Sequence, residues 1–349
     1  MKSMAFVLMA FLLANLTGCV TVSDDPALLT FDQSRLPPAD ISLTIPGLGP
    51  CTDNPDRTLH LNSQQPVTVL VHGCFASTGR FRALAEVMAF HGQQTACFTY
   101  NDRDSMMLSS AQLAASLDTL AGQLRNKQIT VVGHSQGALI ARKALVAERP
   151  DAVQNKQLQL KLVTISGPFA GIAAAEQCGS PTPEMRLLTL GLIVPLCKIV
   201  SGDKWHEITS ASDFIRQPGE LLPQVQSYLK IDTDEQGACL QLNEAGGCAK
   251  QDKVFSLAEQ FYKPVDESAK VKNVVVKAGH VEIVGDQRVA PLKLIALLQQ
   301  NGILNQTEAK RGAAFNQLLD RLYLADIGNA AQHKAAGAVF CQACGHPAQ

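Results

Sequence analysis

The stretch ITVVGHSQGA, residues 129–138, decides the fold. It opens with an apolar, β-branched run typical of a buried strand, and it ends where a helical pattern begins. Between the two stands the pattern Gly-x-Ser-x-Gly, centred on Ser135. The glycines allow a turn that is too tight for side chains two positions from the serine, and the turn lifts the hydroxyl to a helix N-terminus. We therefore expect Ser135 to be a nucleophile and not a structural turn serine.

Strand and helix patterns alternate on both sides of this turn. The residue patterns predict strands at 67–71, 95–100, 129–132, 160–165, 227–231 and 271–276, and helices at 79–91, 108–124, 138–147 and 289–298. Strands separated by helices favour a mostly parallel sheet covered on both faces, so the predicted fold class is α/β.

Composition excludes two broad classes of protein. The 349 residues carry 30 Lys+Arg against 31 Asp+Glu, a formal charge of −1, which offers no field to hold a nucleic acid. With 46 % hydrophobic and 17 % charged residues, the chain is also not a disordered one.

The first 18 residues predict a signal peptide. Lys2 precedes an apolar run, Met4–Ala14, which is too short to span a bilayer but suits the core of a secretory signal. The following residues, LTGC at 16–19, resemble the lipobox of bacterial lipoproteins. This resemblance implies cleavage before Cys19, lipid on that cysteine, and a chain anchored in the cell envelope, with Val20 favouring the outer membrane. Residues 19–40 then serve as a tether.

Residues 64–300 resemble the α/β-hydrolase superfamily, and within it bacterial triacylglycerol lipases and related esterases. The resemblance rests on Val71-His72-Gly73, on the serine turn, and on SGPFAG at 166–171. It implies an oxyanion hole made of two backbone N–H groups, those of Cys74 after His-Gly and Gln136 after the serine. Neither a cofactor nor a metal site is expected.

The family resemblance also directs the choice of the general base. Of the eight histidines, His280 follows a predicted strand and a small-residue turn, which is where this family carries its histidine. The others lie in the motifs above, upstream of the serine, in an insertion or in the tail. We therefore expect His280 to be the base.

The acid should follow the strand that precedes the histidine strand. The segment QDKVFSL, residues 251–257, resembles the stretch that carries the acid in such lipases, and it makes Asp252 the first choice. Asp203 and Asp234 remain alternatives, whereas Asp213 lies in what resembles a family insertion segment.

These residues together predict a serine hydrolase that forms an acyl-enzyme on lipid acyl esters at a membrane surface. Two alternatives stay open. The same side chains could transfer the acyl group to an alcohol, or the chain could be a non-catalytic lipoprotein that binds lipid or a partner.

The hydrolase domain is expected at 41–300, with an insertion at 167–226 and a helical extension at 301–349. The insertion contains an apolar run, Leu187–Val200, that suits either a buried helix or a mobile lid.

Nine cysteines remain after Cys19, and an exported chain is expected to form disulfides. Plausible local pairs are Cys178/Cys197, Cys239/Cys248 and Cys341/Cys344, with zinc as a weaker alternative at the last pair. For Cys74 we expect a bond to Cys51 or Cys97.

Overall fold

The structure is a computed structural model that describes residues 32–74, 76–176, 182–184, 202, 204–285 and 289–323. The predicted signal peptide with Cys19, the apolar run Leu187–Val200, Asp203, and the cysteines Cys178, Cys197, Cys341 and Cys344 lie outside the described residues.

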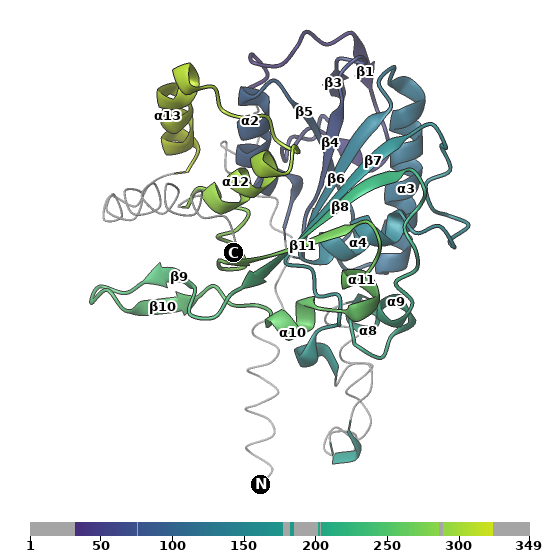
Figure 1. Cartoon of the computed structure of the whole chain (residues 1–349), viewed down its shortest axis with the longest axis vertical. Coiled ribbons are helices and arrows are strands. Elements are labelled where there is room, and N and C mark those ends of the chain that lie inside the picture. Colours follow the sequence, from purple (N-terminus) through teal and green to yellow (C-terminus); the bar gives the residue numbers. More distant parts are fainter. Residues whose placement is uncertain are drawn as a thin grey trace, which may run out of the picture.

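A seven-stranded sheet forms the centre of the molecule (Figure 1), in the order β11-β8-β7-β6-β4-β5-β2. Six strands are parallel, and β2 pairs with β5 in the antiparallel direction at one edge. The strands are β2 Leu48–Gly49, β4 Val67–Val71, β5 Gln94–Phe98, β6 Gln128–His134, β7 Gln159–Ile165, β8 Val225–Asp234 and β11 Val271–Lys277. The predicted α/β class is confirmed, and each predicted strand is found within a few residues of its expected position.

Helices cover both faces of the sheet, and each face has its own apolar cluster. Leu113, Leu117 and Leu139 belong to one cluster, while Leu84, Leu294 and Leu318 belong to the other, all at most 3 % exposed. Each such side chain contributes about 1.5–3 kcal/mol by its burial. The first face carries α3 Met106–Gln123 and α4 Gln136–Ala144; the second carries α2 Arg82–Phe90, preceded by η2 Thr78–Phe81, and α12 Leu292–Gln300.

The described start of the C-terminal extension joins the second cluster. Helix α13, Gly312–Leu322, follows η4 Ala309–Arg311, and its Phe315 ring lies 5.1 Å from the ring of Phe90 in α2. Residues up to Tyr323 therefore belong to the same apolar cluster as α2 and α12.

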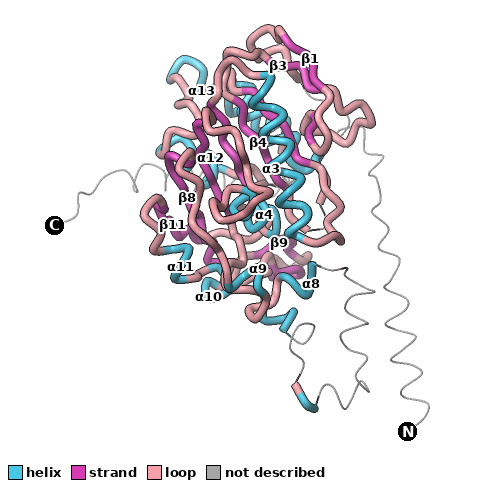
Figure 2. The backbone as a smooth tube through the Cα atoms, turned by 90° about the vertical axis from the view of Figure 1, so that its right-hand side faces the viewer, coloured by secondary structure: helices cyan, strands magenta, loops and turns pink. Residues whose placement is uncertain are grey.

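Short helices gather at one end of the molecule, opposite the small β1–β3 sheet (Figures 1 and 2). They follow the carboxyl ends of β7 and β8, where side chains from neighbouring parallel strands meet. They are η3 Ala173–Ala175, α8 Lys204–Glu207, α9 Asp213–Arg216, α10 Leu257–Gln260 and α11 Lys263–Asp266; β1 is Ile41–Leu43 and β3 is Leu59–Leu61.

An exposed hairpin, not predicted from the sequence, interrupts the path from β8 to β11. It consists of β9 Cys239–Leu242 and β10 Cys248–Gln251, which pair in the antiparallel direction and project from the body (Figure 1). The disulfide Cys239–Cys248 closes it and confirms that predicted pair.

The second disulfide corrects the expectation for Cys74. Cys51, shortly after β2, bonds to Cys97 in β5, because the pairing of Gly49 with Cys97 brings these segments together. Cys74 is a free thiol.

Strand β8 carries a buried charge cluster just before it ends. The ammonium group of Lys230 is fully buried and donates to the carboxylates of Asp232 and Asp266, the latter at 2.8 Å. Burial raises the pKa of Asp232 to about 6, against the opposing effect of Lys230. The ion pairs compensate a charge that the core could not otherwise hold.

In the described ranges, no helix combines the length and the apolar character that crossing a membrane requires.

Candidate active site

Ser135 stands at the junction of β6 and α4 in a backbone conformation that few side chains adopt, with φ 58° and ψ −125°. Its N–H donates to the carbonyl of Ile165 in the adjacent strand at 2.9 Å. A Cβ on Gly133 would lie 2.3 Å from the carbonyl oxygen of Gly137, and one on Gly137 would lie 2.3 Å from that of Val71. Both glycines of the pattern are therefore required, and the strain of about 1–3 kcal/mol is held by the surrounding sheet.

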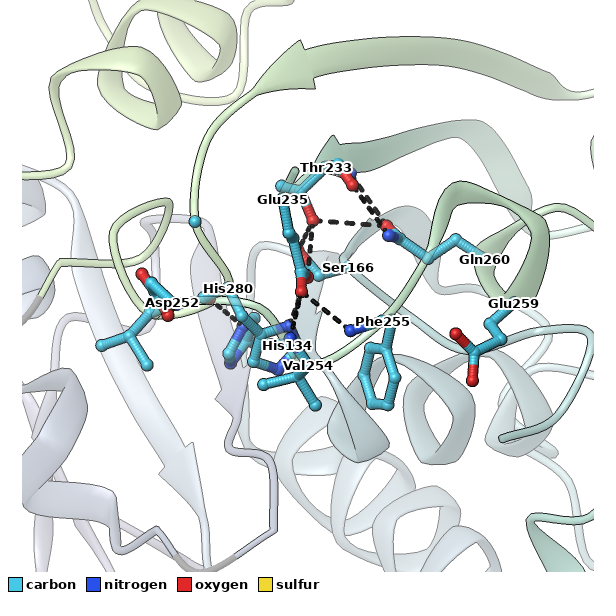
Figure 3. A network of polar contacts seen from close by, with 12 residues as sticks. His134, Ser166, Thr233, Glu235, Asp252, Val254, Phe255, Glu259, Gln260 and His280 are labelled. Atoms are coloured by element: carbon cyan, nitrogen blue, oxygen red, sulfur yellow. Dashed lines mark hydrogen bonds and ion pairs between the residues drawn. The ribbon is translucent and has the colours of Figure 1, made fainter. Parts of the chain in front are cut away.

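His280 lies three residues beyond Lys277, the last residue of β11, and its side chain is buried. The Nδ1 atom is 2.8 Å from Oε1 of Glu235 (Figure 3). Because an ionised carboxylate can only accept, Nδ1 carries the proton and Nε2 keeps its lone pair. The ring of Phe255 meets the imidazole edge-on at 4.9 Å. The arrangement fixes the tautomer that a general base needs.

Glu235 follows the last residue of β8 directly, and its side chain is fully buried. Besides His280, Oε1 accepts from the hydroxyl of Thr233 at 3.1 Å. The other oxygen, Oε2, accepts from the N–H groups of Val254 at 2.5 Å and Phe255 at 2.8 Å. All four neighbours are donors, so the site is built to hold a carboxylate at this position.

The contact expected between Asp252 and the imidazole is made by Glu235 instead. The carboxylate of Asp252 accepts from the backbone N–H groups of Val281 and Glu282, and Figure 3 shows the two carboxylates on different sides of His280. The physical reason is that the β9–β10 hairpin separates Asp252 from the end of β8, whereas Glu235 emerges from the strand next to β11.

Of the alternatives, Asp234 pairs with Lys277 at 3.0 Å on the surface. Sequence reasoning missed Glu235, although the rule that the acid follows the strand before the histidine strand points to it. The resemblance of the segment 251–257 to the stretch that carries the acid in such lipases favoured Asp252 instead.

Cys74 and Gln136 lie beside the serine, as expected for an oxyanion hole. A Cβ on Gly73 would be 2.8 Å from Cβ of Ser135, so the loop after β4 runs against the nucleophile. Within the described part of the chain, no protein group accepts from the backbone N–H of either residue. The thiol of Cys74 contacts the side-chain oxygen of Gln136, which joins the loop after β4 to the start of α4.

The groups around the serine are held in their neutral forms. Burial, reinforced by His280, lowers the pKa of His134 well below its ordinary value, and burial likewise lowers the pKa of His72. Burial also raises the pKa of the Cys74 thiol, against the opposing effect of Lys204. Oxyanion donors are more effective in such surroundings, because few mobile charges compete with the developing negative charge.

His134, the residue before Ser135, contacts His280 directly. The His134 ring lies 4.7 Å from the His280 ring, and its Nε2 is 3.0 Å from the His280 carbonyl oxygen. In the described chain, no hydrogen bond joins the Ser135 hydroxyl to the imidazole. Such contacts are often long in ligand-free enzymes and shorten when substrate binds.

A cavity of about 1040 Å³ lies against the loop after β4, and its lining includes neither Ser135 nor His280. His72 and Ala76 of that loop form one wall, while Tyr100 and one face of α3, including Ala115 and Thr119, form others. The cavity is large enough to bury most of a small ligand.

Comparison with known proteins agrees with this architecture. Residues 66–230, just under half of the chain, match the family model of palmitoyl protein thioesterases. No curated protein is similar enough in sequence to match.

Several solved structures are similar in fold. The mature form of Bacillus licheniformis lipase BlEst2 has a TM-score of 0.44 at 14 % identity, covering 70 % of this chain and 94 % of that one. The Pyrococcus furiosus esterase Pf2001 has a TM-score of 0.42 at 14 % identity, with 78 % and 92 % covered. Esterase B from Lactobacillus rhamnosis has a TM-score of 0.43 at 11 % identity, with 83 % and 90 % covered.

The topology and the family match lead to one conclusion: this chain has the α/β-hydrolase fold, and the match supports an ester-hydrolysing enzyme.

Proposed function

We propose that this chain is a serine hydrolase that cleaves long-chain acyl esters or thioesters through an acyl-enzyme. Ser135 is the nucleophile, His280 the base and Glu235 the acid, with the N–H groups of Cys74 and Gln136 as oxyanion donors. The observation that carries the proposal is the buried hydrogen bond from Nδ1 of His280 to Glu235, 2.8 Å long, beside the strained serine turn.

In the proposed reaction, Nε2 of His280 removes the hydroxyl proton as Ser135 attacks the carbonyl carbon of the substrate. The carbonyl oxygen becomes an oxyanion that accepts from the two backbone N–H groups. When the intermediate collapses, His280 returns the proton to the leaving alcohol or thiol. Water, activated by the same imidazole, then attacks the acyl-enzyme and releases the acid. Glu235 stabilises the imidazolium that forms in both steps.

The substrate class rests on the family match. The matched model describes palmitoyl protein thioesterases, which suggests a long acyl chain and admits a thioester as well as an ester.

A panel of substrates tests this function. We expect a fluorophosphonate probe to label the purified chain, and p-nitrophenyl esters to be cleaved with kcat/KM rising from acetate to palmitate. A palmitoyl thioester should also be cleaved. If the probe leaves the folded protein unlabelled and no ester is cleaved, the chain is a binding lipoprotein and the proposal fails; a preference for acetate would contradict the long-chain assignment.

We further propose that the mature chain starts at the lipid-modified Cys19 and is anchored in the bacterial outer membrane. The support is the LTGC stretch behind an apolar signal segment. Cells fed labelled palmitate should incorporate the label into the wild-type protein, which should sediment with outer membranes. The Cys19→Ser variant should remain unlabelled; a labelled variant would overturn the anchoring site.

A further inference from the structure

We propose that Asp252 is a positioning residue, which fixes the backbone that carries His280 without acting on the imidazole itself. This inference rests on the proposed function, because it concerns the base of that reaction.

The contacts of Asp252 concentrate on three consecutive residues. Its carboxylate accepts from the N–H of Val281 at 3.0 and 3.1 Å and from that of Glu282 at 2.9 Å. Its own carbonyl oxygen accepts from the N–H of His280 at 3.2 Å. With a side chain that is almost wholly buried, one residue thus holds the start of the turn that presents the base.

Gly279 makes this contact possible from the other side. A Cβ at this position would lie 2.1 Å from Oδ2 of Asp252, so only glycine lets the carboxylate reach the turn. The turn is also held at two other points: the N–H of Gly279 donates to Glu282 at 2.9 Å, and Nε2 of His134 lies 3.0 Å from the His280 carbonyl oxygen.

The same short segment also holds the acid. Two and three residues after Asp252, the N–H groups of Val254 and Phe255 bind Glu235, and the Phe255 ring packs on the imidazole. Residues 252–255 therefore contact the backbone of His280, its imidazole ring and the carboxylate of Glu235. A displacement of about 1 Å within such a constellation can cost about 10²-fold in rate.

The test compares Asp252→Asn with Glu235→Gln in the full chain. An asparagine side chain presents one acceptor and one NH₂ group to two N–H donors, so the turn shifts. We expect kcat for a p-nitrophenyl ester to fall about 10- to 100-fold with KM nearly unchanged. Asp234→Asn is the matched control, because the carboxylate of Asp234 is also near β11 but, among the described residues, contacts Lys277 and a turn N–H and not the histidine turn. The acidic limb of the pH profile of kcat/KM should move no further in Asp252→Asn than in this control.

Gly279→Ala disturbs the same contact from the other side, because its Cβ would collide with the carboxylate of Asp252. It tests the inference if Asp252→Asn does not fold. It should lower kcat with the same unchanged pH limb, and the double variant should lose no more than about the worse single variant.

Two results would overturn the inference: kcat within twofold of wild type in the folded single variants, or a shift of the pH limb like that of Glu235→Gln. Both are read against a wild-type enzyme that hydrolyses ester and takes the fluorophosphonate label, so failure here is distinct from failure of the proposed function.

Discussion

Replacing Ser135 by alanine is expected to lower kcat by about five to six orders of magnitude. The variant keeps the oxyanion donors and the histidine, but it has no oxygen to form the acyl-enzyme, and loss of a triad nucleophile has an effect of about this size. Alanine keeps the Cβ and the same positive φ, so we expect the melting temperature to stay near that of wild type. Ester hydrolysis, fluorophosphonate labelling and thermal unfolding measure the three properties.

Ser110→Ala is the matched control for this prediction. Ser110 is also buried, and its hydroxyl donates to the backbone carbonyl of Met106 within α3. It should keep both activity and labelling. Residual hydrolysis by Ser135→Ala above about a thousandth of wild type would assign the nucleophile elsewhere, because the remaining groups alone cannot form a covalent intermediate.

Replacing Glu235 by glutamine is expected to lower kcat about 10³- to 10⁴-fold, the effect of an amide in place of the triad carboxylate. The four groups around the carboxylate are all donors, so the NH₂ of the amide must face either two backbone N–H groups or the imidazole with the hydroxyl of Thr233. Either orientation opposes donor to donor, and one of them also favours the wrong tautomer of His280.

The Glu235→Gln substitution should also change the pH dependence of the reaction. Loss of the carboxylate removes the negative charge that favours the imidazolium, so the acidic limb of the kcat/KM profile should move to lower pH. Glu235→Asp, which retains the charge but is one methylene shorter, should recover part of the rate. If Glu235→Gln stays within tenfold of wild type while Asp252→Asn loses the activity, Asp252 is the acid after all.

The positions of Ser135 and His280 in the fold follow from local sequence patterns. Residues 129–138 predict a buried strand, a tight turn that requires two glycines and a following helix. Ser135 is found in that turn, between β6 and α4. The same holds for His280, which follows a strand and a turn of small residues. Alternating apolar strands and amphipathic helices were sufficient to predict the parallel sheet, because each pattern reflects the burial of its own element.

Only the tertiary structure decided the partner of that histidine. Along the chain, Asp252 and Glu235 are both carboxylates between the last two strands of the sheet, and a local likeness favoured the first. The hairpin closed by Cys239–Cys248 carries the chain away from the sheet and back, so Asp252 returns against the backbone of the histidine turn. Glu235 stays at the end of β8, beside β11, where its carboxylate reaches the ring.

The pairing of Cys51 with Cys97 likewise depends on how distant segments pack together. Their separation of 46 residues says nothing about proximity until β2 pairs with β5. Which side chains meet across neighbouring strands depends on the order and register of the sheet, and these arise from packing of the whole chain and not from any one segment of it.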